Sequence, residues 1–386
     1  MVRVLFLGTG TQALSVLRPL AKDGNKVFIL TNEYGNYADL SKYVTKVYYT
    51  EHKVDDTVFL QFTIDVIEKE HIDTIIPTGD SIAELVSKHL ELFSDIVKIK
   101  APDYDTFLKG YDKNELMNLC REKGYPHPDT IDMASTNLEN SKVFKSFPYP
   151  GLLKPNCTTG GRGMTMIDSY ETLKTIYPQV KAQFGECHLQ RFVKEGGHQV
   201  KIQLYVDENG DLVHHSVLDK VRWYPVKGGS SCCAVSIENQ KLVDICYNIL
   251  KDIHWVGFAD FDTIEDADTH ELLIMEINPR IPACIGAAVN AGINWGQIII
   301  DGNMGNKQKE YKYETGIVLR HLGFDVLWFL KSPNRFKTHP SWFQFFGRKV
   351  GYQDFSISDM KPFFVGTYHN IKKLFDPEFK KAKTGA

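Results

Sequence analysis

The stretch LLIMEINPR, residues 272–280, decides the fold, and it follows a second strand-like stretch, GFADFD, at residues 257–262. Glu276 and Asn278 are two residues apart on a strand, so their side chains emerge on one face. Asp260, on the preceding strand of a hairpin-like pair, can face them across the ladder. Two carboxylates and one amide oxygen suit Mg²⁺, which completes its octahedron with water and phosphate oxygens. The sequence therefore predicts a metal site here, and the alternative is an edge strand with solvated polar residues.

A glycine-rich loop lies upstream, between two short strands. The strand GLLKP at residues 151–155 precedes TTGGRGM at residues 158–164, and another strand follows at residues 165–167. Glycines let successive backbone N–H groups close on an anion, and Lys154 adds a point charge. The loop differs from a Walker loop, which leads into a helix and ends in GK[ST]. It nevertheless predicts a phosphate site.

The first 100 residues alternate strands with helices. Strand-like stretches stand at residues 2–7, 26–31, 46–49 and 74–77. This alternation predicts a parallel, doubly wound sheet. The turn GTGTQA at residues 8–13 fits the dinucleotide-binding fingerprint, and Glu33 lies about where a ribose-binding acid would be. A nicotinamide cofactor is therefore one alternative, and a glycine turn that binds another anion, or nothing, is the other.

Length and composition narrow the class of protein. A chain of 386 residues exceeds the roughly 250–300 residues of one hydrophobic core, so we expect two or three domains. A formal net charge of -3 argues against nucleic acid or an anionic membrane as the main partner. No apolar run approaches the roughly 18 residues of a membrane span, and the opening MVRVLFL lacks a secretory signal. We expect a cytoplasmic protein whose seven cysteines, without a CxxC pair, are reduced.

Together these stretches resemble the ATP-grasp ligases, a family that includes biotin carboxylase, the synthetase subunits of carbamoyl phosphate synthase and carboxylate–amine ligases. The resemblance covers roughly residues 1–300. It depends on six features in order: the turn at 8–10, Asp112 with Lys113, the strand around Lys154, the glycines at 160–163, the strand at 190–193, and MEINPR at 275–280. It implies a mixed α/β and α+β fold, in which a Rossmann-like N-terminal domain precedes two lobes that clasp ATP.

The resemblance also implies domain boundaries. Residues 1–100 are the Rossmann-like domain, and residues 101–310 are the ATP-grasp domain, with a small lobe at about 128–192 and a large lobe at about 193–310. Residues 311–386 form a C-terminal extension, in which residues 313–323 could supply a closing strand. This extension is rich in Phe and Trp. We expect these aromatic residues to pack as core, and the alternative is a surface for a homodimer or a partner protein.

Matched by position, the resemblance implies a set of nucleotide-binding residues: Lys113, Lys154, Gly160, Gly161, Gly163, Gln190, Phe192, Val193, and either Glu195 or His198. The two lysines would hold the α- and β-phosphates, and the three glycines would form a lid over them. The backbone of residues 190–193 would recognise adenine, and Glu195 or His198 the ribose. Where the family often has Glu after Gln, this chain has Arg191, so the adenine side departs from the pattern.

The implied reaction activates a carboxylate as an acyl phosphate, using ATP with Mg²⁺ or Mn²⁺. An amine or another nucleophile then attacks, and ADP and phosphate leave. Lys154, Arg280 and the metal would neutralise the transferring phosphoryl group, and Lys220 and Arg222 are candidate contacts for the substrate. The alternatives are a bicarbonate-activating carboxylase or carbamoyl phosphate synthase-like enzyme, a nicotinamide dehydrogenase, and a non-catalytic nucleotide sensor. The sequence does not identify the acid, the amine, the pathway or the oligomeric state.

Overall fold

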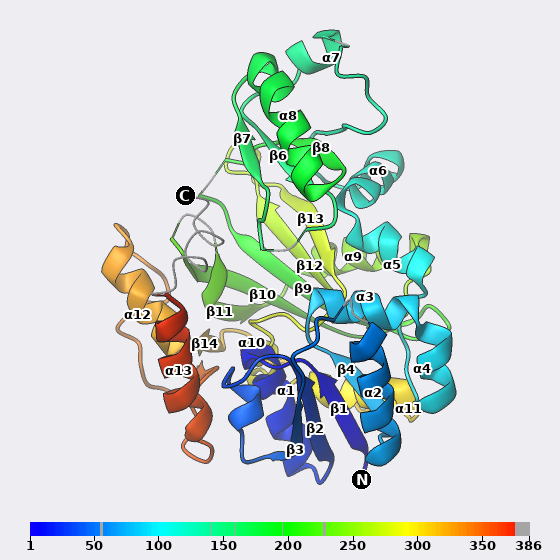
Figure 1. Cartoon of the computed structure of the whole chain (residues 1–386). Helices are drawn as coiled ribbons and strands as arrows, with labels where there is room; N and C mark the ends of the chain where they lie inside the picture. Colours follow the sequence, from blue (N-terminus) through cyan, green and yellow to red (C-terminus); the bar gives the residue numbers. More distant parts are fainter. Residues whose placement is uncertain (55–56, 140, 159, 195, 227–228, 375–386) are drawn as a thin grey trace.

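The computed structural model describes all residues except 55–56, 140, 159, 195, 227–228 and 375–386. Within that part the strands form three sheets, of four, seven and four strands. Figure 1 shows the N-terminal sheet at one end of the molecule, the seven-stranded sheet in the middle and the second four-stranded sheet at the other end. The mixed α/β character expected from the sequence is present.

The first sheet is parallel and has the strand order β3-β2-β1-β4. Its strands are β1 (Arg3–Leu7), β2 (Lys26–Thr31), β3 (Val44–Tyr49) and β4 (Thr74–Pro77). The associated helices are α1 (Thr11–Lys22), the 3-10 turn η1 (Ala38–Leu40), α2 (Thr57–Lys69), α3 (Asp80–Lys88) and α4 (Leu90–Ile96). These strands agree with the predicted ones to within two residues.

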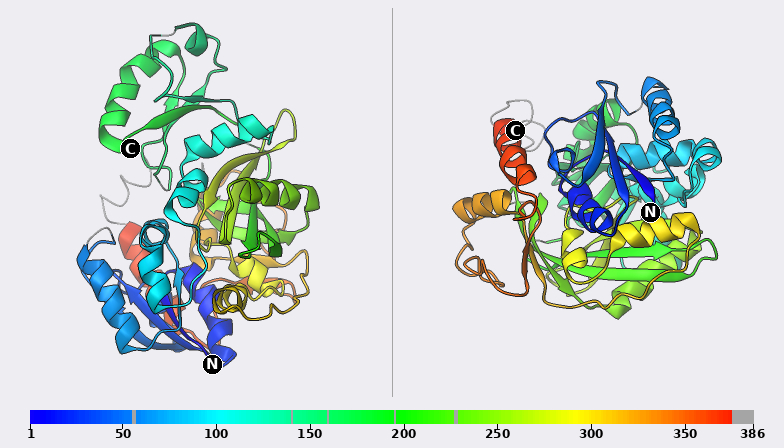
Figure 2. Two further views of the ribbon diagram at one scale, coloured as in Figure 1. Left: turned by 90° about the vertical axis from the view of Figure 1, so that its right-hand side faces the viewer. Right: turned by 90° about the horizontal axis from the view of Figure 1, so that it is seen from below.

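Both faces of this sheet are covered, which explains the almost uninterrupted apolar runs of β1, β2 and β4. Val4 and Phe6 of β1 share a core with α1, whereas Leu5 and Leu7 share another with α2. The first core also takes in Trp295 of α11 (Trp295–Met304), a helix far along the chain. Figure 2 shows α11 lying beside α1.

The second four-stranded sheet is antiparallel, with the order β5-β8-β6-β7. It contains β5 (Thr130–Asp132), β6 (Gly151–Pro155), β7 (Thr165–Ile167) and β8 (Cys187–Arg191), with the helices α7 (Ser141–Lys145) and α8 (Tyr170–Phe184). Leu153 and Leu189 pack with Leu173 of α8. Because side chains alternate along a strand, Lys154 and Gln190 emerge on the opposite face.

The seven-stranded sheet has the order β13-β12-β9-β10-β11-β14-β15, and only its β14–β15 pair is parallel in the described part. Its strands are β9 (Gln199–Val206), β10 (Leu212–Tyr224), β11 (Ser230–Ile237), β12 (Gly257–Glu265), β13 (Leu272–Asn278), β14 (Val318–Arg320) and β15 (Val350–Tyr352). The helix α9 (Gln240–Asp252) covers one face, and α10 (Gly286–Asn290) with α11 covers the other. Two helices, α5 (Tyr104–Tyr111) and α6 (Lys113–Lys123), connect the first sheet to the small lobe.

The C-terminal residues add β14, β15, α12 (Leu322–Lys331) and α13 (Lys361–Leu374). The closing strand expected within residues 313–323 is β14. The aromatic residues divide between the two expectations, because Trp328 is buried whereas Phe336 and Phe346 are 71% and 91% exposed. None of the helices in the described ranges has the length and apolarity that crossing a bilayer requires.

Candidate active site

The candidate site lies where the small lobe meets β12 and β13 (Figure 1). Lys113, the first residue of α6, joins the two sides. Its Nζ donates to the carbonyl oxygen of Thr158 at 2.8 Å and lies 3.5 Å from Glu276 Oε2. Asp112 accepts two backbone N–H groups of the first turn, which fixes the start of the helix. Lys113, the glycine loop and the β12–β13 hairpin are therefore brought together.

Lys154 lies on β6, and its Nζ donates to the Gln190 side-chain oxygen on β8. Among the residues that the structure describes, it has no ion-pair partner. Burial lowers the pKa of Lys154 to about 8, and the nearby charges of Glu276 and Lys113 act on it in opposite directions. A buried ammonium that lacks a paired carboxylate favours an anionic ligand.

His188 lies opposite Lys154 in the β6–β8 ladder and is fully buried. Its Nδ1 forms a hydrogen bond of 2.9 Å with Asn156 Oδ1. Burial, and then the charges of Lys154 and Lys113, hold the pKa of His188 well below its usual range. This histidine is therefore neutral, and the positive charge of the site comes from the two lysines.

The predicted phosphate loop has the backbone that its glycines permit. Gly160, Gly161 and Gly163 have φ angles of 64°, 73° and 76°, a region that disfavours side chains. A Cβ at Gly163 would also lie 2.8 Å from atoms of Phe184 and Pro155, so this position excludes side chains for two reasons. The loop can thus present backbone N–H groups beside Lys113 and Lys154.

The segment predicted to recognise adenine, residues 190–193, begins in the last two residues of β8. Gln190 is buried, and its amide holds Lys154 rather than facing solvent. Phe192 N donates to Pro150 O, while Val193 is buried. Arg191, the departure from the family pattern, donates to Asp266 Oδ2 at 2.8 Å and so ties this segment to the β12–β13 turn.

The two candidates for the ribose differ in what can be described. Glu195 lies outside the described residues. His198 has an exposed ring whose Nδ1 is 2.8 Å from Asp219 Oδ2, and its backbone N donates to Glu265 Oε2. The ring is thus oriented by a carboxylate at the edge of the site.

The predicted metal ligands lie on paired strands. Asp260 is directly opposite Asn278, and Asp262 is opposite Glu276. Asn278 Nδ2 donates to Asp260 Oδ2 at 3.3 Å and to Asp262 Oδ2 at 3.2 Å, which turns its Oδ1 away from both acids. Asn278 Oδ1 and the Glu276 carboxylate are therefore the oxygens available to a hard cation. No cluster of three or more His, Cys, Asp or Glu side chains suited to a metal occurs in the described ranges.

Asp260, in contrast, is engaged by other side chains. Its Oδ2 accepts from Lys201 Nζ at 2.6 Å, and its Oδ1 accepts from Gln203 Nε2 at 2.7 Å. Lys201 also donates to Asp262 Oδ2 at 2.7 Å, and Lys220 donates to Asp262 Oδ1 at 3.1 Å. Because both oxygens of Asp260 are bonded inside the sheet, the geometry does not leave this carboxylate available to a metal.

The charges of this buried cluster depend on one another. Burial raises the pKa of Asp260, although Lys201 opposes the shift. Despite burial, Lys201 and Lys220 lower the pKa of Asp262, and the two acids raise the pKa of Lys201. Lys201 thus remains an ammonium ion within the sheet.

Arg280 follows β13 and is held by a residue of the N-terminal sheet region. Its Nε and Nη2 donate to Asp80 Oδ1 and Oδ2 at 2.9 Å and 3.2 Å, a bidentate pair. Burial lowers the pKa of Arg280, but the Asp80 carboxylate raises it, and the net shift is upward. Asp80 thereby fixes the orientation of a guanidinium close to Glu276.

The structure does not bring Arg222 to this group, contrary to expectation. Its guanidinium is fully buried, donates to both oxygens of Asp325 at 2.7 Å and 3.1 Å, and donates to Pro340 O. A bulge in β10 explains the difference, because the pairing with β11 shifts between Lys220 and Arg222. The extra residue breaks the alternation of side chains, so Lys220 reaches Asp262 whereas Arg222 reaches the C-terminal extension.

Sequence reasoning missed Lys201, Gln203, Asp262 and Asp80. The first two alternate along the polar face of β9, and this spacing within QVKIQLYV was a usable signal. Asp80 directly follows β4 and a glycine, at the carboxyl end of a parallel strand where ligands commonly bind. No local pattern, however, pairs Asp80 with an arginine 200 residues away.

Comparison with known protein sequences gives three relevant matches. Residues 112–290 match the family described as "Carbamoyl-phosphate synthase L chain, ATP binding domain". The chain is 22% identical over 309 residues to the C-terminal section of the carbamoyl phosphate synthase large chain of Methanopyrus kandleri, covering 77% of this chain and 55% of that protein. It is 23% identical over 274 residues to D-aspartate ligase of Enterococcus faecium, covering 65% of each. The chain thus spans less than two thirds of the length of both relatives.

Solved structures agree at the level of the fold. A biotin carboxylase complex from Campylobacter jejuni superimposes with a TM-score of 0.68 at 18% identity, over 81% of this chain and 73% of that chain. N5-carboxyaminoimidazole synthetase from Staphylococcus aureus complexed with ADP gives 0.64 at 15% identity, over 82% and 81%. These low identities show a shared fold.

Proposed function

We propose that this chain is an ADP-forming ligase of the ATP-grasp type that joins a carboxylate to an amine, because residues 112–290 match the ATP-binding domain family of carbamoyl phosphate synthase. The observation that carries this proposal is the arrangement of Lys154, Lys113 and Glu276. An ammonium without an ion-pair partner among the described residues stands near a lysine–glutamate pair at 3.5 Å. Such an arrangement suits a metal–polyphosphate, which neutralises the lysines and binds the acid through the metal.

We propose that ATP lies between the small lobe and the β12–β13 hairpin. Lys113 and Lys154 hold its α- and β-phosphates, and Gly160, Gly161 and Gly163 cover them. The backbone of residues 190–193 receives adenine. His198 or Glu195 receives the ribose.

Mg²⁺ is the proposed metal, with Mn²⁺ as a substitute, and Glu276 and Asn278 Oδ1 are its proposed protein ligands. When bound, the metal supplies charge neutralisation for the transferring phosphoryl group. Asp260 has a different proposed role. Its Oδ2, which Lys201 fixes, accepts a hydrogen bond from Asn278 Nδ2 and so keeps Asn278 Oδ1 turned away from the acids.

In the proposed reaction, an oxygen of the carboxylate attacks the γ-phosphorus of ATP, and the bond to ADP breaks. Lys154 and Arg280 stabilise the charge that develops on the phosphoryl oxygens. The amine then attacks the acyl carbon, loses a proton and expels phosphate, so ATP, acid and amine become ADP, phosphate and amide. The name of the D-aspartate ligase relative supports a carboxylate substrate. Because the chain is also similar to carbamoyl phosphate synthase and biotin carboxylase, bicarbonate is the second candidate for the acid that is activated.

The domain organisation remains part of the proposal. We assign residues 1–100 to a Rossmann-like domain, 101–310 to the ATP-grasp lobes and 311–386 to an extension. The parallel order β3-β2-β1-β4 supports the first assignment. A cytoplasmic location and an intersubunit or partner contact through the exposed aromatic residues also remain proposals.

The decisive experiment measures ADP release with carboxylates offered singly and then with amines added. We expect one acid–amine pair to stimulate ADP release, and Lys154→Met to abolish the stimulation. Lys309→Met changes an exposed lysine elsewhere and serves as the matched control. Stimulation by bicarbonate alone would favour the second candidate, and release of AMP with pyrophosphate would exclude an acyl phosphate.

A further inference from the structure

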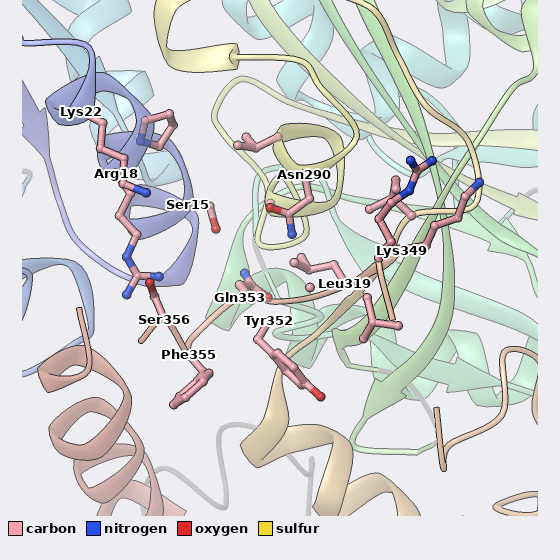
Figure 3. A pocket seen from close by; sticks show the side chains of 17 residues that line it. Ser15, Arg18, Lys22, Asn290, Leu319, Lys349, Tyr352, Gln353, Phe355 and Ser356 are labelled. Atoms are coloured by element: carbon pink, nitrogen blue, oxygen red, sulfur yellow. The ribbon is translucent and has the colours of Figure 1, made fainter. Parts of the chain in front are cut away.

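A pocket of about 500 Å³ lies between α1, α10, β14 and the residues around β15 (Figure 3). This volume falls within the range of small-molecule sites. Lys113, Lys154, Glu276 and Arg280 are not among the residues that line it. The pocket is therefore a separate feature from the candidate active site.

The charge of the pocket is one-sided. Among the residues that the structure describes, no Asp or Glu side chain lines it, whereas four cationic residues do: Arg18, Lys22, Arg348 and Lys349. Two acids lie behind these cations. Asp359 pairs with Arg18 at 3.0 Å, and Glu314 pairs with Arg348 at 3.3 Å and Lys349 at 3.4 Å. Four cations against two acids leave an excess of positive charge, which favours an anionic ligand.

The cations stand at two ends with apolar surface between them. Figure 3 shows Arg18 and Lys22 on one wall, contributed by α1, and Lys349 on the opposite wall. Leu319 lies between these walls, and Ile317 and Val289 also line the pocket. A matching ligand has a negative group at each end and an apolar middle.

Close packing around two glycines defines the shape of the pocket. A Cβ at Gly351 would lie 2.2 Å from Asn290 Nδ2, and a Cβ at Gly286 would lie 2.8 Å from Ser15 Oγ. Asn290 is exposed, and its amide makes no hydrogen bond to other described residues. This amide can therefore bond to a carboxylate or phosphate oxygen of a ligand.

We propose that this pocket binds a small organic dianion, with two carboxylate or phosphate groups joined by an apolar spacer. The ligand bridges α1 of the N-terminal sheet region and the β15 segment. It does not compete directly with the nucleotide for one site, because the two sites share no residue. Since it binds the native state, it also stabilises the protein against unfolding.

Calorimetry with linear dicarboxylates, from glutarate to suberate, tests the proposal against matched monocarboxylates and inorganic phosphate. We expect the best dicarboxylate to bind at least about tenfold more tightly than the monoacid of equal length, because it forms charge-assisted contacts at both ends. Preference for inorganic phosphate would instead indicate a site for one charged group. Equal affinity for diacid and monoacid, or no binding by either, would overturn the proposal.

Single variants locate the site. Lys22→Ala and Lys349→Ala alter exposed side chains on opposite walls, and each should remove most of the advantage of the diacid over the monoacid. Lys309→Ala is the matched control and should keep it. Lys154→Met should also keep it, since Lys154 belongs to the other site. Loss of diacid binding in Lys154→Met with retention in the pocket variants would place the diacid at the nucleotide site and refute the proposal.

Discussion

Lys201 Nζ lies 2.6 Å from Asp260 Oδ2, inside the seven-stranded sheet and behind the candidate metal site. The ammonium group of Lys201 therefore occupies the place beside Asp260 where a metal ion would otherwise bind. The nearby Asn278 amide donates to the same carboxylate oxygen. Through these contacts the buried pair orients the amide oxygen that we assign to Mg²⁺.

The first prediction separates Asp260 from Glu276. Glu276→Gln should weaken Mn²⁺ binding in the presence of a non-hydrolysable ATP analogue by about tenfold or more, because a carboxylate ligand is lost. Asp260→Asn should weaken Mn²⁺ binding less than Glu276→Gln does, because it loosens the Asn278 amide without removing a ligand. Electron paramagnetic resonance of free and bound Mn²⁺ measures both. Equal losses in the two variants would show that Asp260 is a ligand after all.

The second prediction concerns the protonation of Lys154. Its pKa near 8 means that part of the unliganded protein lacks this charge above that pH, and bound phosphates should restore it. Nucleotide binding at a pH slightly above 8 should therefore take up protons, and affinity should fall as the pH rises further. Calorimetry in buffers of different ionisation enthalpy detects the uptake. Lys154→Met should show none, whereas uptake that persists in this variant would assign the proton to another group.

The same shift affects the stability of the unliganded protein. The folded pKa of Lys154 lies below its unfolded value of 10.5, so the unfolded chain holds more protons between pH 8 and 10.5. This group therefore makes unfolding less favourable as the pH rises through that window. Comparing wild type with Lys154→Met in denaturant titrations at several pH values isolates its contribution.

The third prediction tests the bidentate ion pair between Asp80 and Arg280. Arg280→Lys keeps the charge but cannot match the two-point geometry, so it should lose most of the turnover while nucleotide affinity persists. Asp80→Asn should lower kcat by about tenfold or more without changing the KM for ATP, because it only releases the guanidinium from its position. If Arg280 serves as an ordinary ion pair, worth about 0–1 kcal/mol at a surface, both variants should be nearly silent.

The fourth prediction concerns Arg222 and its strand neighbour. Arg222→Met leaves Asp325 buried with one cation fewer, and breaking such a pair costs about 3–5 kcal/mol of unfolding free energy. Turnover per folded molecule should be unchanged well below the thermal midpoint. Lys220→Met, the control on the same strand, should instead reduce turnover with a smaller loss of stability. If Arg222→Met reduced turnover and Lys220→Met did not, Arg222 would instead be assigned a role in the active site.

The fifth prediction identifies the nucleotide. Mg-ATP should raise the thermal midpoint, since a ligand at 100 times its Kd stabilises the native state by about 2.7 kcal/mol. NADH and NADPH should leave the midpoint unchanged. A shift with a dinucleotide and none with ATP would contradict the ligase proposal.

The regular parts of the fold could be predicted from sequence because their signals are local. Alternation within residues 257–262 and 272–280 predicted the hairpin, and the structure places Asp260 opposite Asn278 as expected. The N-terminal strands were equally accessible, because each is a short apolar run between turn residues. The signal for the hairpin is the period of two along a strand, and the signal for the N-terminal strands is a short apolar run bounded by turn residues.

The irregular and long-range parts could not be predicted in this way. The bulge before Arg222 changes which face the side chain occupies, and nothing in DKVRWY marks it. Lys201 and Asp260 are 59 residues apart, so their pairing depends on the strand order of the sheet. Local patterns do not specify that order.

The core shared by α1 and α11 affects how the chain can be divided. Leu14 and Trp295 belong to one cluster, so residues far apart in the sequence complete the support of the first sheet. A fragment that stops at residue 100 would leave that face of the sheet bare to water. Replacing residues 1–100 with those of a relative would place the relative's α1 against this chain's α11, and the two surfaces would not pack together. The N-terminal sheet therefore cannot be exchanged by itself. A functional chimera must take the N-terminal sheet and α11 from the same protein.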